Sequence, residues 1–415
     1  MAMPTKTARL KPALLLYLLG MVALHGLLAW ELRREVRNGY SDFAIFYSAG
    51  KIVGQGLGGH LYDSDLQFRV QQEFAPLVHI RQGPLPYNHP PFEALVFVPF
   101  AKIPYFAAYL LWDFISLVML GVLPCVLRPN VPLCSRLPVS LCLLAALAYF
   151  PIFIGLLQGQ DVIVLLLLFG LTYAALKKNA EFTAGCCLGL GLFRFHLVFP
   201  FVLILLLQKK WRVLSGFVSV AVGLGLISLA VVGWEGILAY PGYVLHLEAI
   251  GGHGSIVPAN MPNLRGLVGI LLAGRASPTI SNGVIAVLSL GLLLLVSAKW
   301  RICATDPTFD LGFSLFSVVT VLVSYHAYAY DLSLLFLPVL LLVGELSEKA
   351  WSRDWSRIAV LSSICLLFFT PLQMILWLRF GALSLLALIL LVLAWGIDCE
   401  IRAQRVGCLR SCDGF

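Results

Sequence analysis

The sequence predicts an all-α protein that crosses a membrane many times. Of its 415 residues, 60% are hydrophobic and only 12% are charged, whereas a typical soluble domain carries about 25% charged residues. The mean hydropathy is +0.91, and apolar runs long enough to cross a bilayer recur along almost the whole chain. The net charge of +8 predicts no nucleic-acid partner, because membrane topology explains where the Lys and Arg residues fall.

Ten uninterrupted apolar runs have the length of a membrane span. An eleventh run, 182–207, contains Phe193-Arg194-Phe195-His196, so it is either one tilted helix of about 39 Å or a hairpin of two short helices. The first run is followed by ELRREVR, which has no signal-peptidase site, and we expect it to be retained. The ten runs are about 12–30, 104–127, 138–157, 160–176, 212–232, 281–298, 311–326, 330–346, 357–377 and 380–397.

The charge distribution favours the hairpin. Lys177 and Lys178 precede the run 182–207, and Lys209 and Lys210 follow it. Because basic residues accumulate on the cytoplasmic side, both pairs are expected there, which requires an even number of crossings between them. The prediction is therefore about 12 transmembrane helices with both termini cytoplasmic.

We expect a single integral membrane domain over residues 1–400, followed by a cytoplasmic tail over 401–415. The polar motifs fall on the predicted outer side, whereas the inner loops are short and basic. They lie in the loop 31–103, which has interfacial helices, in the loop 233–280, in the turns Gln158–Asp161 and Arg194–His196, and in Ser324–Asp331. All ten cysteines lie in predicted spans or on the predicted inner side, as expected of free thiols on the reducing side of a membrane. This asymmetry predicts that the protein works at the outer face.

The segment Tyr40–Asp63 follows the first span and is predicted to contain a short helix. Ser41 or Asp42 can cap its start, and the glycines of Gly54–Gly59 can end it. A helix N-terminus favours an ionised carboxylate, so Asp42 is a candidate general base at the mouth of a membrane cavity. An ordinary helix cap has the same sequence pattern, and composition alone supports both interpretations equally.

The other outer motifs also have structural alternatives. Pro90-Pro91 after Asn88-His89 can simply begin an interfacial helix, which we favour. Gln158-Gly159-Gln160-Asp161 fits a tight turn capped by Asp161 as well as a site. Arg194 would lie about 18–20 Å deep in the bilayer, where ionisable groups usually face a functional or water-filled cavity, although it could also be paired with a carboxylate for structure alone. An interfacial aromatic belt explains the tyrosines around His326 and Asp331, but not these two residues.

In this order, the motifs resemble the family-87 glycosyltransferases, polytopic enzymes of the GT-C class related to polyprenyl-phosphate-mannose-dependent α-mannosyltransferases. The resemblance covers about residues 40–345, and no single motif is specific. The matching elements are Asp42-Phe43 with Tyr47-Ser48-Ala49-Gly50, Gly56 with Leu61-Tyr62-Asp63, Tyr87-Asn88-His89-Pro90-Pro91-Phe92-Glu93-Ala94-Leu95 with Pro99 and Pro104, Gly159-Gln160, Asn263-Leu264-Arg265-Gly266-Leu267, and His326 with Tyr330-Asp331-Leu332.

The resemblance implies a GT-C-type fold in a bacterial inner (plasma) membrane, with a cavity facing the periplasmic side and Asp42 at the position of the catalytic base. Such an enzyme would move a hexose, with mannose the expected sugar, from a polyprenyl-phosphate donor to an outer-leaflet glycolipid or envelope glycan, with inversion. Because a lipid phosphate is already a good leaving group, no cofactor and no metal are expected, although Asp63 and Asp65 could form an acidic metal-binding pair.

Positive groups near the donor phosphate would offset its charge. In related chains a Lys often stands where this sequence has Phe193–His196. Arg194 keeps a positive charge there, but the difference from the family pattern leaves the identity of the sugar donor less defined. Two other functions remain open. One is a transporter or flippase of a lipid-linked saccharide, although the sequence shows no second half-copy of the kind such proteins often have. The other is a non-catalytic membrane partner, against which the presence of Asp42 argues. The candidates for binding the donor phosphate or substrate are Arg194, His196, Arg265, His326, Asn88, His89, Gln160, Asn263 and Asp331.

Overall fold

The computed structural model describes residues 6–75, 85–249, 257–348, 351 and 353–412. Its regular elements are all helical, as predicted, and the described residues contain no strand. The α-helices are α1 (Lys6–Glu31), α2 (Arg33–Arg37), α3 (Phe43–Gly54), α4 (Ser64–Phe74), α5 (Pro91–Phe97), α6 (Tyr105–Leu127), α7 (Pro132–Arg136), α8 (Val139–Leu147), α9 (Phe150–Leu157), α10 (Val162–Lys177), α11 (Glu181–Leu190), α12 (Phe195–Leu207), α13 (Trp211–Ala249), α14 (Leu264–Leu272), α15 (Pro278–Lys299), α16 (Phe309–Val323), α17 (Phe336–Glu348), α18 (Asp354–Phe368), α19 (Thr370–Met374) and α20 (Leu386–Cys412). Short 3-10 or π turns are η1 (Gly58–His60), η3 (Phe100–Lys102), η4 (Gly191–Arg194), η5 (Pro258–Asn260), η6 (Ala329–Leu335), η7 (Ile375–Arg379) and η8 (Leu383–Leu385).

The described part of the chain holds seven helical segments that are long and apolar enough to cross a membrane. The number rises to nine if each of two bent pairs is one span: α8 with α9, bent by 77°, and Asp354–Phe368 with Thr370–Arg379, bent by 67°. The chain is therefore a multi-pass membrane protein, as predicted. Twelve crossings and the cytoplasmic location of the termini stay predictions.

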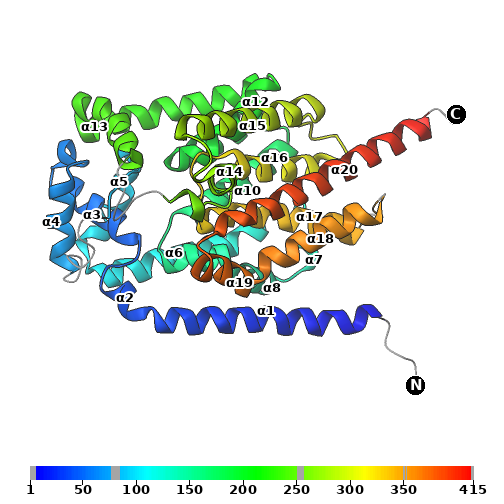
Figure 1. Ribbon diagram of the computed structural model, residues 1–415, viewed down its shortest axis with the longest axis horizontal. Helices are drawn as coiled ribbons and strands as arrows, with labels where there is room; N and C mark the ends of the chain where they lie inside the picture. The colour runs from blue at the N-terminus through cyan, green and yellow to red at the C-terminus, as the bar shows by residue number, and fades with distance from the viewer. Residues whose placement is uncertain (1–5, 76–84, 250–256, 349–350, 352, 413–415) are drawn as a thin grey trace.

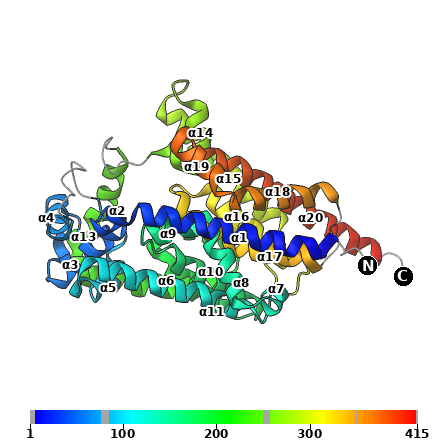
Figure 2. The same ribbon diagram turned by 90° about the horizontal axis from the view of Figure 1, so that it is seen from below.

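The elements of the predicted first outer loop gather at one end of the molecule. There α2, α3, α4 and α5 lie together beside the second half of α13 (Figures 1 and 2). At the opposite end α1 begins and α20 ends (Figure 1). The predicted loop 233–280 is partly helical, because α13 continues through a kink at Gly233 as far as Ala249. The predicted tail 401–415 continues α20 as far as Cys412, and residues 413–415 lie outside the described residues.

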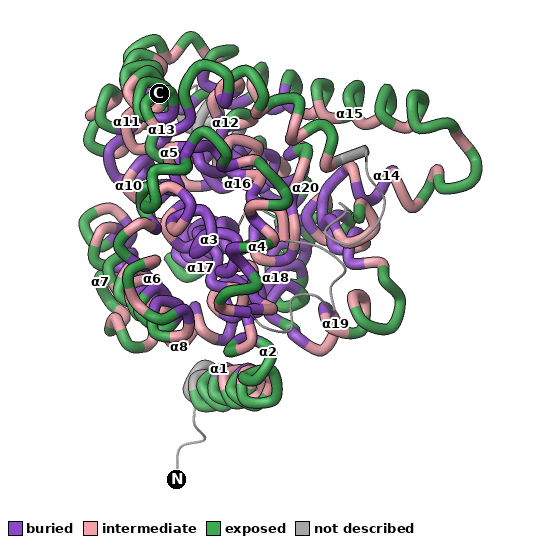
Figure 3. The backbone as a smooth tube through the Cα atoms, turned by 90° about the vertical axis from the view of Figure 1, so that its left-hand side faces the viewer, coloured by how far each residue is buried: buried purple, intermediate pink, exposed green. Residues whose placement is uncertain are grey.

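Burial separates the helices of the core from those that face the membrane. In the most apolar 18-residue stretch of α1 and of α15, only 11% of the residues are buried, compared with 83% in the segment Ala329–Glu348. Figure 3 shows α1 as an exposed tube beside the body and the buried chain around α3, α10, α16 and α17. Apolar helices with so little protein contact are expected to face lipid, since lipid does not penalise exposed Leu and Val.

The segment Glu181–Leu207 doubles back on itself. By length and composition it passes as one span, but Lys210 Nζ lies 3.3 Å from Glu181 Oε1. A straight helix would separate the two ends of this segment by about 40 Å. The chain therefore turns at η4 between α11 and α12, which confirms the predicted hairpin and brings Arg194 to its tip.

Gly185 is where the hairpin packs against the next helix. A Cβ added there would lie 1.8 Å from the carbonyl oxygen of Val213 in α13, a backbone atom that cannot rotate away. We expect Gly185→Ala to destabilise the protein by about 1–3 kcal/mol, the usual cost of overpacking. Gly223→Ala is the matched control, because a Cβ on Gly223 meets nothing within 4 Å. Thermal unfolding in detergent should show a loss for Gly185→Ala only; equal melting temperatures would contradict this packing.

Candidate functional site

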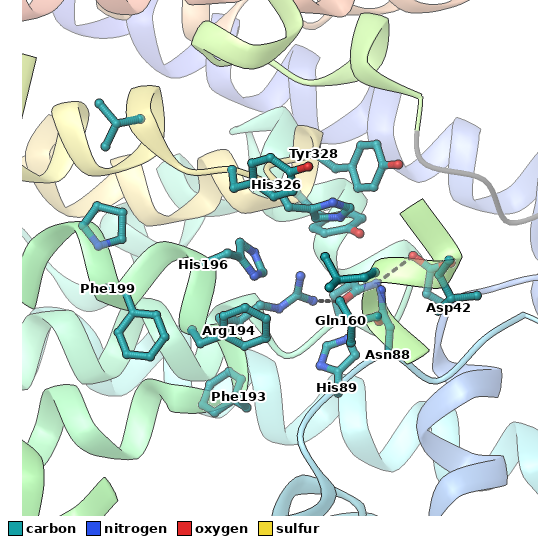
Figure 4. A pocket seen from close by; sticks show the side chains of 18 of the residues that line it. Asp42, Asn88, His89, Gln160, Phe193, Arg194, His196, Phe199, His326 and Tyr328 are labelled. Carbon is teal, nitrogen blue, oxygen red and sulfur yellow. Dashed lines mark hydrogen bonds between the residues drawn. The ribbon is translucent and has the colours of Figure 1, made fainter. Parts of the chain in front are cut away.

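A cavity of about 870 Å³ opens between the outer-loop elements, the η4 turn and the loop before η6. Figure 4 shows its polar side chains converging on one end, with phenylalanines on the other side. The described polar or aromatic lining residues are Asp42, Asn88, His89, Gln160, Phe193, Arg194, Phe195, His196, Phe199, Tyr325, His326, Tyr328 and Tyr330. The cavity thus joins a hydrogen-bonding end to an apolar wall, as an amphipathic ligand requires.

Asp42 stands at the start of α3 and faces the cavity. It occupies the N-cap position, yet its side chain makes no capping hydrogen bond, so the plain helix-cap interpretation does not account for it. The half-buried carboxylate instead accepts a hydrogen bond from Gln160, whose Nε2 lies 2.6 Å from Asp42 Oδ2. Among the described residues that line the cavity, Asp42 is the only Asp or Glu.

The turn 158–161 docks onto the start of α3 and carries Gln160 to Asp42. The Phe43 N–H donates to the carbonyl of Gln158 over 2.8 Å, and the Asp42 N–H donates to Gln158 Oε1 over 3.0 Å. Gly159 makes the sharp turn with φ +62°, and a Cβ there would lie 2.7 Å from the Phe43 Cβ. Glycine meets both demands, since it adopts positive φ at no steric cost. The turn is therefore part of the site, beyond its role in connecting α9 to α10.

Arg194 lies at the tip of the hairpin and is 2% exposed. Its Nε donates to Asp161 Oδ1 over 2.6 Å, and its Nη1 lies 3.2 Å from Asp331 Oδ1. Its Nη2 donates to Gln160 Oε1. The guanidinium thus orients the amide that reaches Asp42 (Figure 4). The carboxylates of Asp161 and Asp331 already offset its charge. The side chain of Asp161 makes no capping hydrogen bond to α10 and binds Arg194 instead, so the alternative of a turn merely capped by Asp161 does not account for it.

His89 and Glu93 come from the start of α5. Pro91 occupies the first turn of this helix, as predicted for an interfacial helix, and His89 precedes it. His89 Nδ1 lies 2.8 Å from Glu93 Oε2 and 3.8 Å from Asp161 Oδ2. Burial lowers the pKa of His89 to about 4, so its imidazole is neutral at pH 7. Burial raises the pKa of both carboxyls, although Arg194 acts in the opposite direction.

Three predicted binding residues hold the loop 324–328 and do not line the cavity. Asn263 caps α14 by accepting from the Gly266 N–H, and its Nδ2 donates to the carbonyl of Ser324 over 2.7 Å. Arg265 donates to the carbonyl of Tyr325 over 3.1 Å and stacks on its ring. Asp331 accepts from the Tyr328 N–H over 2.7 Å. Their polar groups thereby position Tyr325, His326 and Tyr328 at the cavity.

His196 and His326 both line the cavity, and their rings pack edge to face. Their ring centroids are 5.5 Å apart, and the Tyr328 ring lies 4.7 Å from that of His326. Burial lowers the pKa of His326 to about 3, with Arg194 and Arg265 contributing in the same direction. The lowered pKa favours the neutral imidazole, which can donate a hydrogen bond to a phosphate.

The apolar wall continues from the polar end along α12. Its described residues come mainly from α12, with single contributions from α15 and α16 and three from the end of α13: Phe195, Phe199, Pro200, Val202, Leu203, Leu206, Leu293, Val323, Val244, Leu245 and Leu247. Sequence reasoning did not assign these residues to the site, because an apolar membrane helix carries no pattern that separates lipid-facing from cavity-facing positions.

The acidic pair of the first outer loop does not join the site. Asp63 caps α4 by accepting from the N–H groups of Asp65 and Leu66, and neither aspartate lines the cavity. Sequence reasoning also left Glu93 and Asp161 without a role in the site. Both lie inside recognised motifs, but burial against His89 and Arg194 becomes visible only in the fold.

A comparison with protein families completes the description of the site. The searches of curated proteins and of solved structures found no match. A model of glycosyltransferase family 87 matches residues 87–325. The match takes in Asn88, His89, Gln160 and Arg194, whereas Asp42 precedes it. Because the match covers more than half of the sequence, the chain belongs to glycosyltransferase family 87 and is a membrane glycosyltransferase.

Proposed function

We propose that the protein transfers a hexose, with mannose the first candidate, from a polyprenyl-phosphate donor to an outer-leaflet glycolipid or envelope glycan. The site would face the periplasmic side of a bacterial inner membrane, in a GT-C-type fold with 12 spans and cytoplasmic termini. The observation that carries the proposal is one cavity whose described lining has a single carboxylate, at its polar end, and an apolar wall beyond it. A donor with a charged sugar-phosphate head and a hydrocarbon tail has this same division.

The proposed reaction inverts the anomeric carbon in one step. Asp42 accepts the proton of the acceptor hydroxyl while the oxygen forms its bond to the anomeric carbon. The bond between that carbon and the phosphate oxygen breaks, and its electron pair leaves with the polyprenyl phosphate. Gln160 holds the carboxylate in place, and Arg194 holds Gln160. No nucleotide is needed, and no metal is needed at the donor phosphate.

Neutral donors are the proposed partners of the phosphate. Asp161 and Asp331 offset the charge of Arg194, so its main role is to fix Gln160 and to keep the local charge from becoming more negative. The Asn88 amide and the imidazoles of His196 and His326 line the same end of the cavity. Hydrogen bonds from such groups to a charged acceptor each contribute roughly 1.5–3 kcal/mol.

The donor class is tested with membranes that express the chain and membranes that do not. Each is given radiolabelled polyprenyl-phosphate mannose or nucleotide-linked mannose, with a crude lipid fraction as acceptor. The proposal expects a new labelled glycolipid from the lipid donor only, and only when the chain is present. Movement of the donor across the bilayer without a new glycoside would favour a flippase, and transfer from the nucleotide sugar would overturn the proposal.

The apolar wall predicts a dependence on the length of the donor chain. Leu203 lines the cavity on α12, whereas Leu207 on the same helix does not. We expect Leu203→Trp to raise KM for a long polyprenyl donor about tenfold, since a lost contact of about 1.4 kcal/mol corresponds to that factor. A donor with one or two isoprene units should be unaffected. Leu207→Trp is the control. If both variants had equal effects on both donors, the polyprenyl tail would not bind along this wall.

A further inference from the structure

His89, Glu93 and Asp161 form a buried cluster beside the cavity. Their exposed fractions are 8%, 4% and 2%. Each of the three residues offers one possible metal-ligand atom, and these atoms all lie within 4.8 Å of one another. His89 and Glu93 come from the start of α5, and Asp161 comes from the turn before α10, so the cluster joins two separate parts of the chain.

None of the three facing atoms accepts a hydrogen bond from a described donor, so only a proton on one of the carboxyls, shared between Glu93 and Asp161, would make a hydrogen bond among them. His89 Nδ1, Glu93 Oε2 and Asp161 Oδ2 are all buried and unsatisfied. His89 and Glu93 are close enough for a hydrogen bond, at 2.8 Å, but their geometry does not make one. Leaving a buried polar atom unpaired costs about 1–3 kcal/mol, and more for a charged group. Three such atoms directed at one another indicate a missing common partner.

The local charge is also unbalanced. Asp161 and Asp331 share one cation, Arg194. Among the described ion pairs, Glu93 has no Lys or Arg partner, only His89. The imidazole nitrogen of His89 is a common type of metal ligand. The cluster therefore calls for a bound cation or for added protons.

We propose that His89 Nδ1, Glu93 Oε2 and Asp161 Oδ2 bind a divalent transition-metal ion of the zinc type. One imidazole nitrogen with two carboxylate oxygens is a donor set that suits zinc, whereas magnesium and calcium prefer oxygen ligands alone. Pro90-Pro91 fixes the backbone between the two ligands at His89 and Glu93. Three protein ligands leave the remaining coordination to water.

The role we assign to this ion is structural. It would tie the start of α5 to the turn that carries Gln160, and it would hold one oxygen of Asp161 while Arg194 binds the other. The ion thereby fixes two walls of the cavity relative to each other. The assignment stands on the cluster alone and does not depend on which sugar donor is used.

The test measures metal content in the intact protein. Wild type, Glu93→Gln, His89→Gln and the control Glu73→Gln are purified in detergent without a polyhistidine tag and analysed by inductively coupled plasma mass spectrometry. Glu73 is a carboxylate of the same first loop, paired with Lys51 at the surface. We expect about one equivalent of zinc-type metal in wild type and in Glu73→Gln, and background levels in the two ligand variants.

A second readout separates a ligand role from a general folding role. A strong chelator should lower the melting temperature of wild type by a few degrees, and added Zn²⁺ should restore it. The same treatment should leave Glu93→Gln unchanged. The proposal would be overturned if wild type contained no metal and its melting temperature did not change with the chelator. The cluster would then be held by a proton shared between Glu93 and Asp161. Equal metal content in wild type and both ligand variants would overturn it as well.

Discussion

Replacing Asp42 with Asn is expected to lower kcat for sugar transfer by about 10²–10⁴-fold, the usual contribution of a general base. The asparagine side chain has the size of aspartate, and its amide oxygen can still accept the hydrogen bond from Gln160 Nε2. Because Asp42 does not cap α3 through its side chain, the variant should keep the stability of the wild type. The loss should therefore appear in kcat, with little change in KM for the donor.

Asp65→Asn is the matched control for this substitution. It makes the same chemical change in the same outer loop, at an exposed aspartate in the first turn of α4. Transfer rates and melting temperatures of the two variants are compared at equal protein concentration. If Asp42→Asn retained wild-type activity, Asp42 would not be the base, and His326 would become the next candidate because it also lines the cavity.

Arg194→Met is expected to destabilise the protein by about 3–5 kcal/mol, the usual cost of removing one partner of a buried ion pair. Methionine fills much of the same volume but leaves Asp161 and Asp331 without their shared cation. The substitution also releases the Gln160 Oε1 that Arg194 binds. The free energy of unfolding, or the melting temperature in detergent, should fall together with activity.

A double variant shows whether charge is the cause. Arg194→Met with Asp331→Asn removes one of the two stranded carboxylates, and asparagine can still accept the hydrogen bond from the Tyr328 N–H. We expect this double variant to be more stable than Arg194→Met alone. If the single variant were as stable as wild type, both carboxylates would have to be neutral in the folded protein, and Arg194 would not organise the site through its charge.

Much of the architecture could be predicted from the sequence, because hydropathy and charge act locally. Basic residues on both sides of 182–207 required the hairpin, and the contact between Glu181 and Lys210 confirms it. The helix after Asp42 runs from Phe43 to Gly54, within the predicted bounds, although the Asp42 side chain makes no capping hydrogen bond. The course of α13 beyond Gly233 was not predictable, because its polar half lacks the continuous apolar run by which spans are recognised.

The candidate site was harder to predict, because a motif does not reveal the direction of a side chain. Asn263, Arg265 and Asp331 belong to recognised motifs, yet their polar groups hold the loop that carries His326. Conversely, Glu93 and Asp161 were not assigned to the site, although both are buried beside His89. Only the fold brings these residues, from α5 and from the turn before α10, into contact.

The configuration of the newly formed glycosidic bond tests the central claim most directly. The purified protein is given one synthetic polyprenyl-phosphate hexose of known anomeric configuration, and the product is examined by NMR. With Asp42 as the only carboxylate among the described lining residues of the cavity, the account predicts a single product of inverted configuration. A product of retained configuration would contradict the account. Retention requires a nucleophile that forms a glycosyl-enzyme intermediate, and it also requires a base that then activates the acceptor.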